Sequence, residues 1–178
     1  MKRSGYFFFF LLVLTAFGPS CTNQATTAPP PEPEETILST IFLVRHAEKE
    51  EGDDPGLTEA GHARAQALAD MLEAVQVDAI FSTDYRRTQL TAAPLAEQKA
   101  LTVQSYNPRE LAEFAEQLKA DYVGKIIVVV GHSNSTPTLT GFLDGTEAHP
   151  SFDESDYGNL MLVQLPNNGP AKTLRLRF

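Results

Sequence analysis

The chain has 178 residues, of which 42% are hydrophobic and 21% are charged, as in ordinary soluble globular proteins. This length suffices for one domain with a hydrophobic core. Without Lys2 and Arg3, which lie in an apolar N-terminal segment, twelve basic residues remain against 23 acidic ones, a net charge of −11. Such a charge argues against nucleic-acid binding and against electrostatic adhesion to anionic lipid.

The first twenty residues have the plan of a secretory signal. Lys2 and Arg3 form a positive start, residues 6–17 are almost wholly apolar, and Gly18-Pro19-Ser20 is small and turn-forming. A retained membrane anchor is the alternative, but the apolar run is short for a membrane span. We therefore expect residues 1–20 to be a signal peptide.

Cys21 is the only cysteine and follows this segment directly, so it cannot form an internal disulfide. Its placement resembles a bacterial lipoprotein signal, in which the cysteine becomes the lipidated first residue. Gly18 departs from that pattern, because such signals favour leucine there. Cleavage by an ordinary signal peptidase, leaving a free thiol, is the other interpretation. We expect lipidation at Cys21, which would place an exported domain at the cell envelope, in the periplasm or outside.

Residues 22–36 are rich in threonine, proline and glutamate. Such a segment cannot bury enough apolar surface to become ordered, and its prolines keep it extended. We expect residues 21–36 to be a lipidated, disordered tether and residues 37–178 to be the folded domain.

The folded domain alternates strand-like and helix-like segments. The first half predicts a strand over 37–44, a helix over 58–75 with Thr58 as N-cap, a strand over 79–82, a helix over 87–98 and a strand over 101–105. The second half predicts a helix over 110–122, a strand over 125–130 and a helix over 138–143, which begins near Pro137 and stops at Gly145. It also predicts strands over 160–165 and 173–178 around the turn Asn167-Asn168-Gly169. This order predicts an α/β fold, a three-layer α/β/α sandwich with a mainly parallel sheet, to which the last two strands add an antiparallel edge.

Two histidines follow predicted buried strands. Arg45-His46-Ala47 ends the run 41–44, and His132 ends the run 126–131. The carboxyl ends of parallel strands meet at one edge of the sheet, where ligands of α/β proteins bind. An arginine fork matches phosphate oxygens, and a neutral imidazole can attack phosphorus. The pattern therefore predicts a phosphate site.

Four motifs in order resemble the histidine phosphatase superfamily, the phosphoglycerate mutase-like group. They are Arg45-His46-Ala47, Leu57-Thr58-Glu59-Ala60-Gly61, residues 82–92, and Gly131-His132-Ser133. Any one motif is a weak signal, but four in the right order on the right elements are specific. The resemblance covers most of residues 37–165 and is greatest to the compact branch. It implies a phosphoglycerate mutase-like fold.

The resemblance also implies roles for individual residues. His46 would be the nucleophile that forms a phosphohistidine, Arg45 and Arg87 would bind phosphate oxygens, and His132 would stabilise the transferring group. The second phosphate-binding arginine would be Arg87 rather than Arg86, because Thr91-Ala92 follows Arg87 at the spacing that the family shows. Ser133 and Asn134 are expected to be turn and capping groups, with donation to phosphate as a second hypothesis. We also expect a backbone carbonyl to hold the other ring nitrogen of His46.

The proton donor is the point at which the sequence departs from the larger family members. Those members carry a lid with a glutamate, and residues 106–110 lack the pattern of such a lid. Glu110 is the first candidate for the acid and Glu48 the second. Without an acid, the enzyme would favour substrates with good leaving groups, such as phosphoramidates or aryl phosphates.

The sequence therefore predicts an exported phosphatase that hydrolyses phosphomonoesters or phosphoramidates through a phosphohistidine. A lipoprotein that binds a phosphorylated ligand without turnover, and a phosphomutase, are the alternatives. The expected partner is a small phosphorylated substrate, with no metal, cofactor or nucleic acid. The chain is expected to be a monomer that touches the membrane only through its lipid anchor.

Overall fold

The computed structural model describes residues 37–146, 149–166 and 169–178. The predicted signal peptide, Cys21 and the tether lie outside the described residues, as do Asn167 and Asn168 of the predicted turn. All described residues belong to one unit, Glu34–Phe178.

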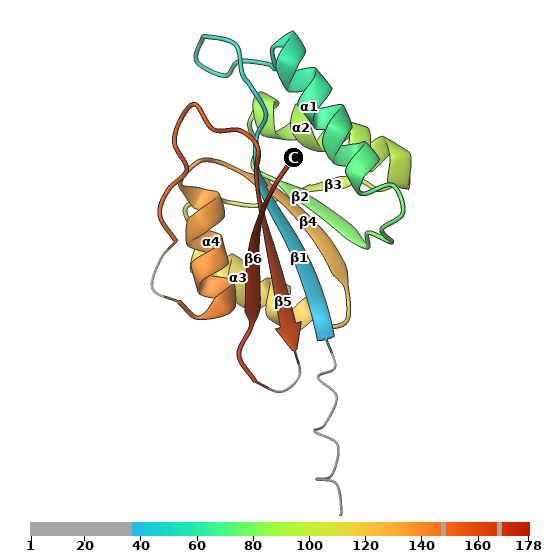
Figure 1. Ribbon diagram of the computed structural model, residues 1–178, viewed down its shortest axis with the longest axis vertical. Helices are drawn as coiled ribbons and strands as arrows, with labels where there is room; N and C mark the ends of the chain where they lie inside the picture. The colour runs from blue at the N-terminus through green and yellow to red at the C-terminus, as the bar shows by residue number, and fades with distance from the viewer. Residues whose placement is uncertain (1–36, 147–148, 167–168) are drawn as a thin grey trace, which may run out of the picture. The chain divides into compact units, whose positions relative to one another are not determined.

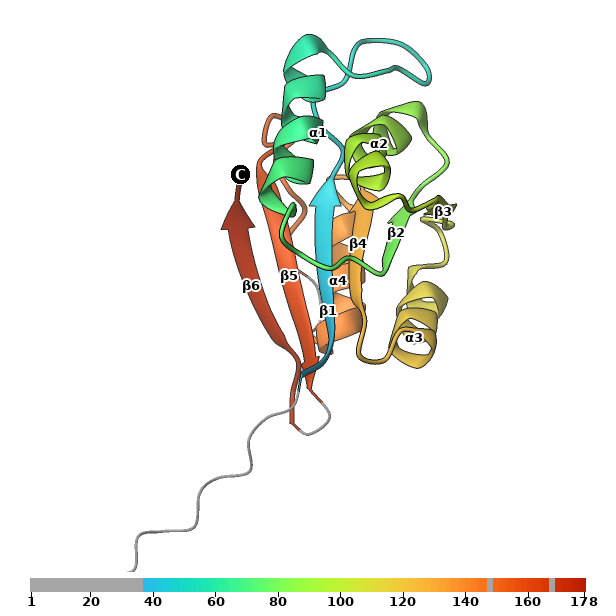
Figure 2. The ribbon, with the colours of Figure 1, turned by 90° about the vertical axis from the view of Figure 1, so that its right-hand side faces the viewer.

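A six-stranded sheet with the order β3-β2-β4-β1-β5-β6 forms the middle of this unit (Figures 1 and 2). The parallel strands are β1 (Ile37–Arg45), β2 (Ala79–Ser82), β3 (Val103–Ser105) and β4 (Ile126–Gly131). The antiparallel strands are β5 (Asn159–Pro166) and β6 (Lys172–Arg177), which extend the sheet beyond β1. The mainly parallel sheet with an antiparallel edge is thus confirmed.

Two helices cover each face of the sheet. The first pair is α1 (Glu59–Met71) and α2 (Arg86–Lys99), and the second pair is α3 (Leu111–Asp121) and α4 (Ser135–Asp144). Residues of β4 alternate between the two cores: Val128 packs with α1 and α2, whereas Ile127 and Val129 pack with α3 and α4. A strand that is buried on both faces reads as a continuous apolar run, which explains its sequence. The three-layer sandwich is confirmed.

Capping side chains set several helix boundaries. The Thr58 hydroxyl accepts a hydrogen bond from the Gly61 amide at 3.1 Å and so caps α1, as predicted. The side chain of Asn134 caps α4 by accepting from the Ser135 amide at 2.8 Å, so this helix begins before Pro137. It ends at Gly145, whose φ of 73° stops the helix as expected. The helix predicted over 58–75 is shorter, because the chain turns after Met71 and continues toward β2.

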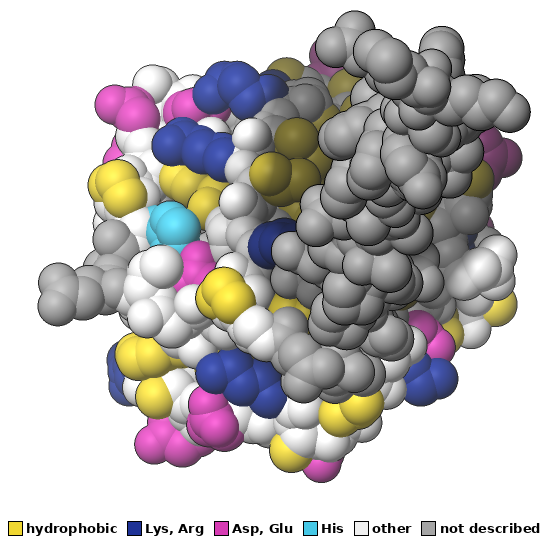
Figure 3. All heavy atoms as spheres, turned by 60° about the horizontal axis from the view of Figure 1, so that its bottom comes forward, with side chains coloured by type: hydrophobic (Ala, Val, Ile, Leu, Met, Phe, Trp, Pro, Cys, Tyr) yellow, Lys and Arg dark blue, Asp and Glu magenta, His cyan; other side chains and the backbone are white. Residues whose placement is uncertain are grey.

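Figure 3 views the molecule from the edge opposite the carboxyl ends of the parallel strands. On the part of that face drawn in colour in Figure 3, basic and acidic side chains are interspersed.

Within the described ranges, none of the helices combines the length and apolar content that a membrane crossing requires.

Candidate active site

The pairing of β1 with β4 brings the two histidines side by side. Arg45 is the register partner of Gly131, and the His46 amide donates to the Gly131 carbonyl at 2.9 Å. His46 and His132 therefore leave the sheet at the same edge, and their ring centroids lie 5.6 Å apart. Next to β4, β2 ends at Ser82 and leads through Thr83 into α2, which adds Arg87 to the same place.

A cavity of about 360 Å³ lies at this edge of the sheet. It is lined by His46, Lys49, Arg87, His132, Ser133, Asn134, Ser151 and Glu154. Although His46 borders the cavity, its side chain is almost completely buried, with 3% of the residue exposed. The cavity thus combines two imidazoles, an arginine and several polar groups in a small space.

The ring of His46 is held in one orientation by a backbone oxygen. Its Nδ1 lies 2.8 Å from the Ala47 carbonyl oxygen, which can only accept, so Nδ1 carries the proton and Nε2 keeps its lone pair. The pKa of His46 is lowered to about 4, mainly by burial and to a smaller extent by the neighbouring Arg45, Arg87 and His132, against the opposing hydrogen bond to Ala47. The imidazole is therefore neutral at neutral pH, with its lone pair on Nε2. The backbone carbonyl that was predicted to hold the second ring nitrogen of His46 is that of Ala47.

The ring of His132 is neutral for similar reasons. Its Nδ1 lies 3.4 Å from Nη2 of Arg87, which can only donate, so Nδ1 accepts. Its Nε2 then carries the proton and donates to the hydroxyl of Thr83 at 3.0 Å. Burial lowers the pKa of His132 to about 4, with smaller contributions from Arg87 and Arg45. The two imidazoles can lie close together because neither is charged.

Arg87 reaches the cavity from the first turn of α2. Its guanidinium carbon lies 4.5 Å from the centre of the Tyr85 ring, and its Nη1 is 3.9 Å from a carboxylate oxygen of Asp54. Its Nε is buried and has no hydrogen-bond partner among the described residues. A buried N–H without an acceptor is costly, so this atom favours a bound anion. The preceding Arg86 is exposed and does not line this cavity.

Arg45 lies behind the cavity wall, with 1% of the residue exposed. Its Nη1 donates to the carbonyl oxygens of Asp153, Glu154 and Asp156 at 2.9, 2.9 and 3.3 Å. The ring of Tyr157 lies 4.1 Å from its guanidinium carbon. As in Arg87, the Nε of Arg45 is buried without a partner within the described part of the chain. The segment after α4 thus fixes this guanidinium by its backbone and leaves part of it for an anion.

Glu154 is the residue that the sequence analysis missed. Its Oε2 accepts from Nη2 of Arg45 at 2.6 Å, and its Oε1 accepts from the Ser133 hydroxyl at 2.5 Å. The hydrogen bond from Ser133, together with the charge of Arg45, lowers the pKa of the Glu154 carboxyl. Its side chain is 78% exposed and lines the cavity. No local pattern marks this glutamate, because it lies in an acidic loop 109 positions after the arginine that it binds.

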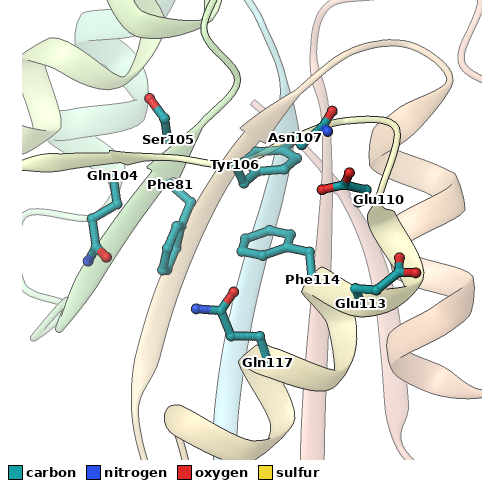
Figure 4. Close-up of a pocket in the computed structure, with 9 residues that line it drawn as sticks. All are labelled: Phe81, Gln104, Ser105, Tyr106, Asn107, Glu110, Glu113, Phe114 and Gln117. Atoms are coloured by element: carbon teal, nitrogen blue, oxygen red, sulfur yellow. The ribbon is translucent and has the colours of Figure 1, made fainter.

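The two carboxylates proposed from the sequence lie elsewhere. Glu110 occupies the N-cap position of α3 and lines a different cavity, beside Tyr106 and Phe114 (Figure 4). Glu48 is engaged by Arg64, whose guanidinium donates to both of its carboxylate oxygens at 2.7–3.0 Å. That pairing lowers the pKa of the Glu48 carboxyl. Glu110 therefore does not line the cavity of the two histidines, because the start of α3 directs its side chain into the neighbouring cavity.

The remaining predicted phosphate ligands line the cavity, but both are engaged. The Ser133 hydroxyl donates to Glu154, and the Asn134 side-chain oxygen caps α4.

Thr91 holds the parts of the site together, because its hydroxyl accepts from the Ala47 amide at 2.9 Å and donates to the Arg87 carbonyl at 2.7 Å. Among the described residues there is no cluster of three or more His, Cys, Asp or Glu side chains that could hold a metal ion.

Comparison with known proteins finds similarity to phosphatases in part of the chain. Residues 41–116 match the family model of the histidine phosphatase superfamily, branch 1. A stretch of 71 residues is 41% identical to phosphoserine phosphatase 1 of Hydrogenobacter thermophilus and covers 35% of this chain. The match spans 34% of that relative, about a third of its length.

Solved structures show the same fold. The protein histidine phosphatase SixA complexed with tungstate superposes with a TM-score of 0.64 at 16% identity, covering 78% of this chain and 96% of SixA. A mycobacterial glucosyl-3-phosphoglycerate phosphatase superposes with a TM-score of 0.55 at 15% identity, covering 70% of this chain and 89% of that chain. The α/β fold with a central mixed sheet and four described helices is that of the histidine phosphatase and phosphoglycerate mutase-like structures.

Proposed function

We propose that this chain is an exported phosphatase of the histidine phosphatase superfamily, which hydrolyses phosphomonoesters or phosphoramidates through a phosphohistidine at His46. The observation that carries the proposal is the meeting of two neutral imidazoles with two arginines, each of which has a buried Nε with no partner among the described residues. A tetrahedral dianion satisfies both Nε groups at once, and guanidinium forks match its oxygens.

The first chemical step uses the lone pair on Nε2 of His46. This nitrogen attacks phosphorus while the bond from phosphorus to the leaving oxygen or nitrogen breaks, and the phosphoryl group stays on the ring. The Arg45 and Arg87 guanidiniums and the His132 ring stabilise the charge on the phosphoryl oxygens. Water then attacks the phosphohistidine, the P–N bond breaks, and the electron pair returns to Nε2.

Glu154 is the carboxyl group placed to move the protons in these steps. Bound phosphate competes with it for Nη2 of Arg45, and the negative charge of the phosphate favours the protonated carboxyl. The protonated Glu154 donates to the leaving atom and later takes a proton from the attacking water. Its exposed side chain can follow the phosphate, whereas Glu48 is held by Arg64.

The test measures phosphate release from 4-nitrophenyl phosphate by the full chain and by His46→Ala, with His62→Ala on the exposed face of α1 as the matched control. Only His46→Ala should lose activity. A second reaction with ³²P-labelled substrate, stopped in alkaline denaturant, should leave label on the wild type and on His62→Ala but not on His46→Ala. Equal rates for all three proteins would refute the proposal.

A protein that binds a phosphorylated ligand without turnover is the second candidate. The ion pair between Glu154 and Arg45 favours it, because it engages the carboxylate in the cavity. Tight phosphate binding by the wild type, without phosphate release and without labelled histidine, would support this candidate.

Export and anchoring rest on the order of charges, apolar residues and Cys21 at the N-terminus. Lipidation of Cys21 would tether the domain to the cell envelope through the segment 22–36. Expression of the full chain in a bacterium fed labelled palmitate tests this. Label should appear on the wild type and be absent from Cys21→Ser, and an unlabelled wild type would refute lipidation.

A further inference from the structure

The cavity of the two histidines continues into a second hollow along the same edge of the sheet. A space of about 240 Å³ shares Arg87, His132 and Asn134 with the active-site cavity and adds Tyr85, Pro108 and Arg109 to its lining. We call this space the Arg109 hollow. Tyr85, Pro108 and Arg109 also line a larger space of about 550 Å³, which carries the surface depression further from the histidines. The opening beside the phosphate site is therefore long enough for more than a phosphoryl group.

The Arg109 hollow lies where a leaving group would project. In-line transfer places the leaving atom on the side of phosphorus opposite the attacking Nε2 of His46. The hollow is bordered by Arg87 and His132, which would contact the phosphoryl group in the proposed reaction, but not by His46. Tyr85 forms part of its wall, with its ring centroid 5.2 Å from that of His132. A substrate held for attack by His46 would extend its leaving group into this hollow.

The charge of the hollow is positive. Arg87 and Arg109 border it, and no Asp or Glu is among its lining residues; Asp84 lines only the larger space beyond. The backbone amide of Arg109 donates to the side chain of Asn107 at 3.0 Å, which shapes the loop. Its guanidinium makes no hydrogen bond or ion pair with any residue of the described ranges. By contrast, Arg45, Arg64 and Arg177 are all paired with carboxylates.

We infer that the leaving group of the natural substrate carries a second anionic group, such as a carboxylate or phosphate, which Arg109 binds in this hollow. The inference rests on the proposed function and specifies its substrate class. In a chain with 23 acidic and 14 basic residues, an arginine that has no partner among the residues the structure describes attracts an anion to the reacting site against the overall field. Its fork can hold such a group by two parallel hydrogen bonds.

The experiment compares phenyl phosphate with 4-carboxyphenyl phosphate and 4-phosphonophenyl phosphate, using the full chain. For each variant, the value of kcat/KM for each anionic substrate is divided by the value for phenyl phosphate. Differences in the intrinsic reactivity of the substrates then cancel when this ratio is compared between variants. Arg109→Gln should lower this ratio roughly tenfold, mainly through KM, because an anchored group is bound equally in the ground and transition states. Arg109→Lys should restore part of the ratio. The two anionic substrates show whether carboxylate or phosphate is preferred.

Arg86→Gln is the matched control, because it removes the same charge from an exposed position that borders neither of these spaces. Its ratio should equal that of the wild type. An unchanged ratio in Arg109→Gln, or an equal fall of the ratio in Arg86→Gln, would overturn the inference. The phosphatase proposal would still stand in that case if the wild type hydrolysed phenyl phosphate. Absence of turnover of all three substrates by the wild type would instead refute the phosphatase proposal.

Discussion

The depressed pKa of His46 makes the stability of the fold depend on pH. The pKa of this ring is about 4 in the folded protein and 6.5 in its ordinary state, so the unfolded chain binds a proton more readily. The stabilisation is therefore present above pH 6.5 and is lost as the pH falls toward 4. With these two pKa values, linkage gives a loss of about 2 kcal/mol in the free energy of unfolding between pH 7 and pH 5 from this ring alone.

The assay is urea denaturation of the wild type, His46→Gln and His62→Gln at pH 7 and at pH 5. Because carboxylates titrate in all three proteins, the informative quantity is the difference between variants in the loss of stability. His46→Gln should lose about 2 kcal/mol less than the wild type over this interval. His62→Gln, which replaces an exposed histidine of α1, should follow the wild type. Equal pH dependence in the wild type and His46→Gln would show that burial does not hold this imidazole neutral.

Three further predictions concern the proton donor and the framework of the site. Glu154→Gln should lower turnover of an alkyl phosphate by about 10²–10³-fold and that of 4-nitrophenyl phosphate far less, because only the poor leaving group needs an acid; equal losses in steady-state assays would exclude Glu154 as the donor. Gly61→Ala should destabilise the fold by about 1–3 kcal/mol in urea denaturation, since the added methyl would clash with the Glu48 carbonyl oxygen; unchanged stability would contradict this close approach. Thr91→Val should lower the free energy of unfolding by about 1–3 kcal/mol, because the buried Ala47 amide loses its acceptor. Thr91→Ser keeps the hydroxyl and should retain most of the wild-type stability.

The elements of the fold could be predicted because each follows from local chemistry. The continuous apolar run of β4 indicates a strand buried on both faces, and Thr58 and Gly145 mark helix ends by capping and by a left-handed backbone. The end of α1 was less predictable, because apolar residues beyond Met71 continue the helical spacing while the chain has already turned.

The sequence by itself determined the strand-to-histidine junctions at His46 and His132, because the carboxyl ends of parallel strands meet at one edge whatever the details of packing. Only the tertiary structure decided which carboxylate lies in the site. Glu48 directly follows the Arg45-His46-Ala47 motif and Glu110 ends the segment 106–110, yet Glu110 lines another cavity and Glu48 is held by Arg64. Glu154 reaches Arg45 from a distant loop, and its place depends on backbone contacts that no local spacing encodes. Long-range ion pairs follow from how layers and loops pack together, whereas strand ends follow from the periodicity of apolar residues.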